Sequence, residues 1–140
     1  MFNTAVVSSY QRILTAGNFG DCVYQRFLES HPEVARRFAG VDMARQKFLL
    51  QRSLTVMMQH AAGLKGADAA LDRIAGQHGP HGMSLPPFLF DYWIDALVGA
   101  VAECDPRCDM ALEAAWRSLL RREVAHFIAR GKQALPLPVG

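Results

Sequence analysis

The sequence predicts an all-α protein with a single domain, and three observations support this prediction. Apolar residues recur every three or four positions along most of the chain, as in amphipathic helices. No stretch alternates apolar and polar residues between hairpin turns, as strands would. The chain has 140 residues, enough for one well-buried core but too few for two comfortable domains. We expect the domain to span residues 1–130 and an irregular tail to follow over 131–140.

Capping residues and glycines divide the first half of the chain into four predicted helices. Asn3 and Asp42 are suitable N-caps for the first and fourth helices, and Pro32 suits the first turn of the third. Gly17 and Gly63 end the first and fourth helices. The predicted helices span Thr4–Thr15, Asp21–Ser30, Pro32–Arg37 and Met43–Ala62.

Three more helices are predicted in the second half. The first spans Ala67–Gln77 and ends in a loop around Pro80. Ser84 is the expected cap of the next, which has Pro86 and Pro87 in its first turn and runs to about Glu103. Asp109 is the expected cap of the last helix, which reaches about Arg130.

Charge and hydropathy exclude several classes of function. The 15 Lys and Arg residues are scattered among 13 Asp and Glu residues, giving a net charge of +2. This balance does not indicate nucleic-acid binding. The longest apolar stretch, Leu85–Ala102, is interrupted by Asp91 and Asp95, which would be costly in a bilayer, and no secretory signal is visible. We therefore expect a soluble, cytoplasmic protein with no membrane partner.

The cysteine content does not predict a disulfide framework. Cys22, Cys104 and Cys108 make an odd number, and Cys104 and Cys108 lack the further ligands of a zinc site. Cys104 and Cys108 flank an Asp-Pro turn and could be bridged under oxidation. Free thiols are the expectation for all three.

Three predicted helices each place one hydrogen-bonding side chain on an apolar face. His78 lies at helical spacing from Leu71 and Ile74, and Tyr24 shares a face with Phe27. Gln46 falls on a stripe formed by Met43, Leu50, Leu54, Met57, Ala61 and Leu64. A buried amide without a partner costs roughly 1–3 kcal/mol, so such groups face something polar or functional. The pattern indicates either a core with satisfied polar groups or the wall of a metal site.

The order of these residues resembles that of a known family. Tyr24, Pro32, Phe38 and Gln46, followed by His78-Gly-Pro-His-Gly-Met and later Ala115-Trp116, resemble bacterial globins of the flavohaemoglobin and single-domain type. The resemblance spans roughly Val6 to Arg130. It implies a globin fold, with three helices packed over three.

The resemblance also implies a cofactor, haem b (iron protoporphyrin IX), and the roles of five residues. His78 would be the axial ligand of the iron, and Phe38 would stack on the porphyrin. Tyr24 and Gln46 would donate hydrogen bonds to a small ligand on the distal side, with Leu50 one helical turn after Gln46. The spacing supports this register, because placing Arg45 or Lys47 at the distal position would bring a polar residue onto the buried stripe.

Met83 and Phe88 are expected to line the proximal side of the haem. His81 is a competing ligand candidate, but Pro80 and Gly82 place it in a turn, where it would face solvent or a haem propionate. Structural roles remain alternatives for Tyr24, whose hydroxyl could bond a carbonyl in the core, and for Gln46. Trp93 and Trp116 are more simply explained as core residues.

The function implied is reversible binding of oxygen or nitric oxide, as in oxygen transport. Phe88 and Gly131 stand where flavohaemoglobins have a tyrosine and a glutamate that polarise the imidazole, so a strong proximal electron push is not expected. One alternative is a nitric oxide dioxygenase that uses a separate reductase, because nothing after Arg130 could hold flavin or nicotinamide. Another is a haem-based gas sensor, or an interaction module that lacks haem.

Overall fold

The structure is a computed structural model of the chain. It describes the backbone of residues 4–77 and 86–134, and the side chains of residues 4–73 and 86–129. Within these residues all regular structure is helical, in agreement with the predicted class. The helices are α1 (Thr4–Ala16), α2 (Phe19–Ser30), α3 (Pro32–Arg37), α4 (Met43–Ala61), α5 (Ala67–Gln77), α6 (Pro87–Cys104) and α7 (Met110–Ala134).

Local capping explains where several helices begin. The Nδ1 atom of His31 accepts a hydrogen bond from the Glu33 amide at 3.0 Å and so caps α3 ahead of Pro32. Asp42 caps α4 through the Arg45 amide at 3.2 Å, and Asp109 caps α7 through the Leu112 amide at 2.8 Å. Both aspartate caps were predicted from the sequence, whereas the His31 cap was not.

Some predicted boundaries need correction. Helix α6 begins at Pro87, and its N-cap is Pro86, without a side-chain hydrogen bond, rather than the predicted Ser84, which lies outside the described residues. The last helix continues to Ala134 rather than ending near Arg130, so Gly131 lies within α7. Leu64, placed on the buried stripe of α4 by spacing, follows the helix end and is 56 % exposed.

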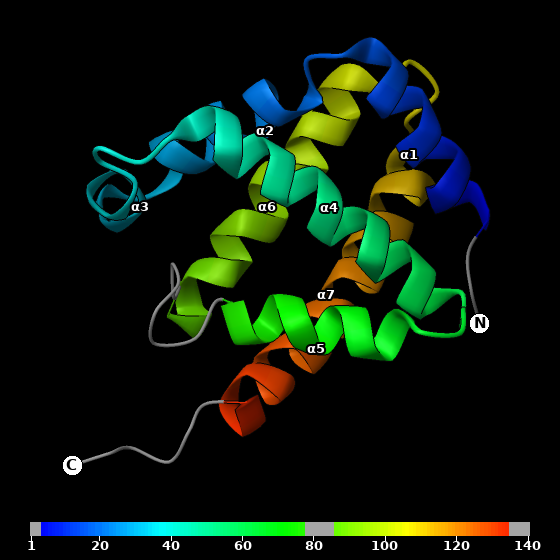
Figure 1. The fold of residues 1–140 in the computed structure, drawn as a ribbon. Coiled ribbons are helices and arrows are strands. Elements are labelled where there is room, and N and C mark those ends of the chain that lie inside the picture. Colours follow the sequence, from blue (N-terminus) through cyan, green and yellow to red (C-terminus); the bar gives the residue numbers. More distant parts are fainter. Residues whose placement is uncertain (1–3, 78–85, 135–140) are drawn as a thin grey trace.

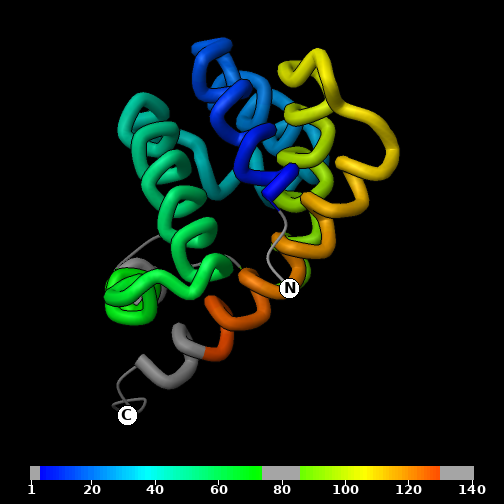
Figure 2. The backbone as a smooth tube through the Cα atoms, turned by 90° about the vertical axis from the view of Figure 1, so that its right-hand side faces the viewer, coloured from blue at the N-terminus to red at the C-terminus, as the bar shows by residue number. Residues whose placement is uncertain are grey.

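The helices form two layers. Figure 1 shows α4 and α5 in front of α6 and α7, and Figure 2, turned by 90°, shows α4 and α5 on one side and α6 and α7 on the other. The most extensive contacts between helices join α2 to α6, followed by those of α5 with α7. The buried side chains between the layers include Phe27, Leu54, Leu97 and Trp116, each fully enclosed. Trp93 and Trp116 are buried as predicted for core residues.

A buried carboxylate joins the two ends of the fold. Asp105, in the turn between α6 and α7, accepts hydrogen bonds from Arg12 Nε at 2.8 Å and Arg12 Nη2 at 2.9 Å. Ser9 Oγ donates to the same carboxylate at 2.6 Å and accepts from the Trp116 indole at 2.9 Å. The Arg12 guanidinium lowers the pKa of Asp105 to about 2. A charged, hydrogen-bonded cluster thus ties α1 to α7.

A second buried carboxylate holds the end of α4 against α7. Glu123 Oε1 lies 2.7 Å from His60 Nδ1, and the Glu123 side chain is almost fully enclosed. His60 Nε2 lies 3.0 Å from Asp68 at the start of α5. The His60 imidazole therefore links three helices.

Among residues 4–77 and 86–134, no helix combines the length and apolar character needed to span a bilayer.

Candidate functional site

Three aromatic rings meet where α2 and α3 approach α4. The Tyr24 and Phe38 rings have centroids 5.7 Å apart, and the Phe27 and Phe38 rings lie 5.9 Å apart in an edge-on contact. Phe38 follows the last residue of α3 and is 7 % exposed. Aromatic edges and faces at these separations attract one another, which fixes the position of Phe38 beneath α2.

The Tyr24 hydroxyl reaches across to α4. It donates a hydrogen bond to the main-chain carbonyl of Gln46 at 3.2 Å. A hydroxyl bonded to a carbonyl is the structural role that the sequence left open for Tyr24. The structure contains this hydrogen bond, and it is a long one. Burial raises the pKa of Tyr24 above its ordinary value, so the phenol keeps its proton at neutral pH and remains a hydrogen-bond donor.

These residues border a small enclosed space, which we call the central cavity. Its volume is about 60 Å³. The lining side chains come from α2, α4, α6 and α7 and the residue after α3: Tyr24, Phe27, Phe38, Gln46, Leu49, Leu50, Met57, Phe90, Trp93 and Phe127. Apolar atoms dominate the walls, and the lining residues that carry polar side-chain atoms are Tyr24, Gln46 and Trp93.

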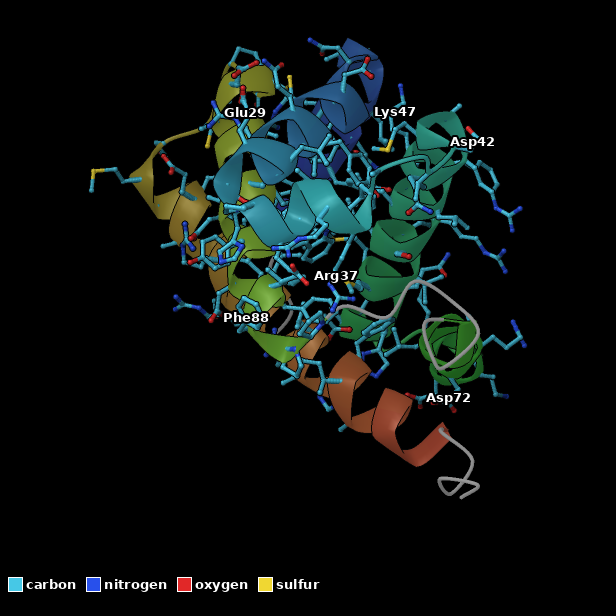
Figure 3. All side chains as sticks on the ribbon, turned by 90° about the vertical axis from the view of Figure 1, so that its left-hand side faces the viewer. Glu29, Arg37, Asp42, Lys47, Asp72 and Phe88 are labelled. Carbon is cyan, nitrogen blue, oxygen red and sulfur yellow. The ribbon has the colours of Figure 1, made fainter. Side chains whose placement is uncertain are left out.

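Gln46 and Leu50 lie on the same side of the cavity, one turn apart on α4. Leu50 is buried and Gln46 is half-buried, and both are among the lining residues. Leu50 also lines a surface groove of about 320 Å³ between α1, α2 and α4. The Leu50 side chain therefore stands between the central cavity and the exterior. Lys47, the next residue after Gln46, lies at the other face of α4 and pairs with Asp21 at 2.6 Å (Figure 3).

Phe88 is the predicted site residue that the structure places elsewhere. It lies at the start of α6, is 51 % exposed and contacts the His31 ring, with centroids 5.6 Å apart (Figure 3). Phe90 lines the cavity instead, with its ring 6.3 Å from Trp93 and 6.0 Å from Phe127. Residues two apart in an α-helix differ by about 200° in direction, so Phe88 and Phe90 cannot both face inward.

Two predicted residues, His78 and Met83, lie outside the described residues, as does the competing candidate His81. The helix that leads to His78 is described, and α5 ends at Gln77, directly before it. On this helix Leu71 is fully buried, as its shared face with His78 predicted. Among described side chains, no group of three or more His, Cys, Asp or Glu residues could hold a metal ion.

Comparison with known proteins identifies the family. A crystal structure from Pseudomonas aeruginosa PAO1, of a protein described as structurally highly homologous to a human hemoglobin, superimposes with a TM-score of 0.81 at 34% sequence identity. The match covers 89% of this chain and 94% of the other chain. The chain is a bacterial single-domain globin. No model of a protein family and no curated protein matches the sequence.

Membership of the globins confirms the fold predicted from the sequence. Helices α4 and α5 lie on one side of the molecule and α6 and α7 on the other, α2 packs most extensively on α6, and the central cavity is lined from α2, α4, α6 and α7 and by Phe38. The sequence missed Phe90 as a lining residue. Its position one helical turn before Trp93 is the signal that could have found it.

Proposed function

We propose that this globin binds haem between α4 and α6 and binds a diatomic gas at the haem iron. The observation that carries the proposal is the central cavity, whose aromatic and aliphatic lining includes Tyr24 and Gln46, two residues with hydrogen-bonding side chains. An apolar lining of this kind favours the porphyrin ring, and the two polar side chains can orient a small ligand. His78, the next residue in the sequence after α5, is the proposed iron ligand, and α5 lies against α4 and α7.

The described residues fit a porphyrin in chemistry, while the space between them is small. Cofactor sites enclose roughly 300–1,000 Å³, and the central cavity measures about 60 Å³. Haem binding therefore requires its walls to move apart. Met57 is the lining side chain best suited to such movement, since an unbranched thioether side chain changes rotamer readily.

The chain's own residues would then act on the bound ligand. Haem supplies a ferrous iron that binds oxygen or nitric oxide. The protonated Tyr24 phenol is a donor at the cavity wall, and exchanging its long bond with the Gln46 carbonyl for one to the ligand would cost little. The Gln46 side-chain amide supplies a second donor, and Leu50 excludes water from the space beside them. Met83 completes the proposed proximal side.

The absorption spectrum of the purified protein tests the proposal. Protein produced with haem available should show ferric, ferrous and carbonyl spectra of a histidine-ligated b-type haem. His78→Ala should lose most of its haem while keeping its helix content by circular dichroism. His81→Ala is the matched control, since it removes a histidine three residues away and should keep the spectrum. Spectra unchanged in His78→Ala would refute the ligand assignment.

Consumption of nitric oxide with a separate reductase is the second candidate function. It is favoured by the presence of both Tyr24 and Gln46 at the cavity. This pair is similar to that of the nitric-oxide-consuming members of the flavohaemoglobin and single-domain globin family that the sequence resembles. Steady nitric oxide loss in the presence of a generic reductase would support catalysis. A single stoichiometric uptake would support reversible binding, and a partner that binds only the gas-loaded form would support sensing.

A further inference from the structure

Two cysteines far apart in sequence meet where α2 crosses α6. The Sγ atoms of Cys22, on α2, and Cys104, the last residue of α6, are 3.6 Å apart. Cys22 is buried and Cys104 is half-buried, and all three cysteines are free thiols, as expected from the sequence. Cys108 takes no part in this contact. Its Sγ lies 3.7 Å from the Asp109 carbonyl oxygen instead. The partner of Cys104 is thus Cys22, whereas proximity in sequence had suggested Cys108.

Charged groups hold the two thiols in place. Cys22 Sγ donates to Glu103 Oε2 at 3.0 Å, while Glu103 Oε1 pairs with Arg26 of α2 at 2.9 Å. Asn18 Oδ1 lies 3.7 Å from Cys104 Sγ. The Arg26–Glu103 pair joins the same two helices as the cysteines, one turn beyond Cys22. Because α2 and α6 make the most extensive helix contact of the fold, the two sulfur atoms cannot drift apart without disturbing it.

We propose that Cys22 and Cys104 form an oxidisable pair that exchanges with small-molecule disulfides to give an intramolecular disulfide between α2 and α6. The bond would replace the sulfur contact, closing the remaining gap by side-chain rotation. This modification site is separate from haem binding, since both thiols lie outside the central cavity.

The order in which the two thiols react follows from the difference in their burial. Burial is the largest cause that raises the pKa of Cys22, to about 12, with further contributions from its hydrogen bonds to Glu103 and Cys104. Cys22 is therefore a thiol, and the more exposed Cys104 reacts first. Its thiolate attacks one sulfur of the small disulfide, releasing one small thiol and forming a mixed disulfide.

The second step completes the exchange within the protein. Cys22 Sγ attacks Cys104 Sγ, the second small thiol leaves as its thiolate, and the proton lost by Cys22 ends on that thiolate. Two protein thiols are oxidised and one small disulfide is reduced to two thiols, so atoms and electrons balance. The pKa of Glu103 is lowered by its bonds to Cys22 and Arg26, so Glu103 stays an ionised carboxylate whose hydrogen bond holds the Cys22 thiol beside Cys104.

The new disulfide would affect both the stability of the protein and helix α2. It would enclose residues 22–104, which include α3, α4 and α5, and would restrict the unfolded chain accordingly. Tyr24 lies two residues from Cys22 on the same helix. Oxidation therefore fixes the helix that carries the phenol of the central cavity.

Equilibration of the full-length, haem-loaded protein in glutathione buffers tests the proposal. As the proportion of oxidised glutathione rises, we expect intact mass to fall by two hydrogens, peptide mapping to locate a Cys22–Cys104 bond, and the Tm to rise by several degrees. Cys108→Ser is the matched control and should behave like the wild type. Cys104→Ser should form no internal bond.

Two results would overturn the proposal: a Cys104–Cys108 bond, or unlinked thiols at every glutathione ratio in protein that remains folded. Differential alkylation of the wild type reports the same pairing without any substitution, so the test survives if a Cys22 variant does not fold. The outcome is also independent of haem. A disulfide in protein that fails to take up haem would uphold this inference while contradicting the proposed function.

Discussion

Two buried phenols donate hydrogen bonds to main-chain carbonyls of α4, and only one of them borders the central cavity. Tyr10 bonds the Gln51 carbonyl at 3.0 Å and lies 2.8 Å from the Thr55 hydroxyl. Tyr24 bonds the Gln46 carbonyl at 3.2 Å and lines the cavity beside the Gln46 side chain. Tyr10 has two partners and Tyr24 has one, which leaves the Tyr24 phenol freer to donate to a ligand. Under the proposed function, the Tyr10 hydrogen bonds are structural and the Tyr24 phenol is the one that can turn to a ligand.

Tyr24→Phe should accelerate oxygen dissociation from the haem-loaded protein by about tenfold, since a lost hydrogen bond is worth about 1–1.5 kcal/mol. Stopped-flow measurement of the dissociation rate checks this expectation. Tyr10→Phe should lose about as much folding stability as Tyr24→Phe does, but it should keep the wild-type rate of oxygen dissociation. Equal rates in the two variants would show that the Tyr24 phenol does not reach the ligand.

Four of the ten lining residues were predicted as site residues from the sequence, and the one misplaced prediction, Phe88, has a physical cause. Tyr24, Phe38, Gln46 and Leu50 lie at the cavity because helical periodicity on α2 and α4 specifies which residues share a face. The inward face of α6 was harder to assign, because this helix is apolar on nearly all sides. Counting from His78 selected Phe88, whereas packing against α7 turns Phe90 inward.

At the scale of helices, the Asp105 cluster joins α1 to the turn between α6 and α7. A buried carboxylate is stable only when its oxygen atoms are paired, and here Arg12, Ser9 and the Arg107 amide supply the partners. Arg12 is the largest cause of the lowered pKa of Asp105, and desolvation opposes it. The ion pair therefore outweighs the cost of burial at neutral pH.

Replacing this carboxylate should make stability less dependent on acid. Because the folded pKa is about 2 against 3.8 in the unfolded chain, Asp105 contributes fully above about pH 4 and loses its contribution as pH falls toward 2. Asp105→Asn should lower the free energy of unfolding by about 2 kcal/mol at pH 7 and flatten its decline between pH 4 and 2. Urea unfolding across pH measures both effects.

Asp95→Asn is the matched control for this change. Asp95 pairs with Arg117 between α6 and α7 but has a side chain that is 65% exposed, so its ion pair is screened by water. The variant should stay within about 0.5 kcal/mol of the wild type. An equal loss in both variants would contradict a special role for the buried cluster.

Helix positions were the most predictable feature of the chain. Aspartate caps and glycines mark ends through local chemistry, so the starts of α4 and α7 and the end of α1 match their predicted residues. The Asp105 cluster was not predicted, because its members lie in three elements that only the tertiary fold brings together. Local sequence signals predict where helices begin and end, but they do not predict polar contacts between residues far apart in the sequence.

At the scale of the whole molecule, the layers enclose a cavity smaller than the proposed cofactor, so haem should act as part of the core. A ligand that binds only the folded state stabilises it by about 4 kcal/mol at a thousandfold excess over Kd. Removal of haem should therefore lower the Tm by about 10 °C or more. Thermal unfolding followed by circular dichroism, with and without haem, measures the difference. His78→Ala should show no such difference, and equal Tm values in the wild type would contradict haem binding to the folded state.

The partners in the Asp105 cluster also set an order of events during synthesis. Ser9 and Asp105 are 96 residues apart, and Ser9 and Trp116 are 107 apart. At translation rates of about 5–20 residues per second, the hydroxyl of Ser9 precedes its acceptor by on the order of ten seconds. Helix α1 must therefore leave the ribosome with its polar groups hydrated, and the cluster can close only after the chain has been made as far as Trp116.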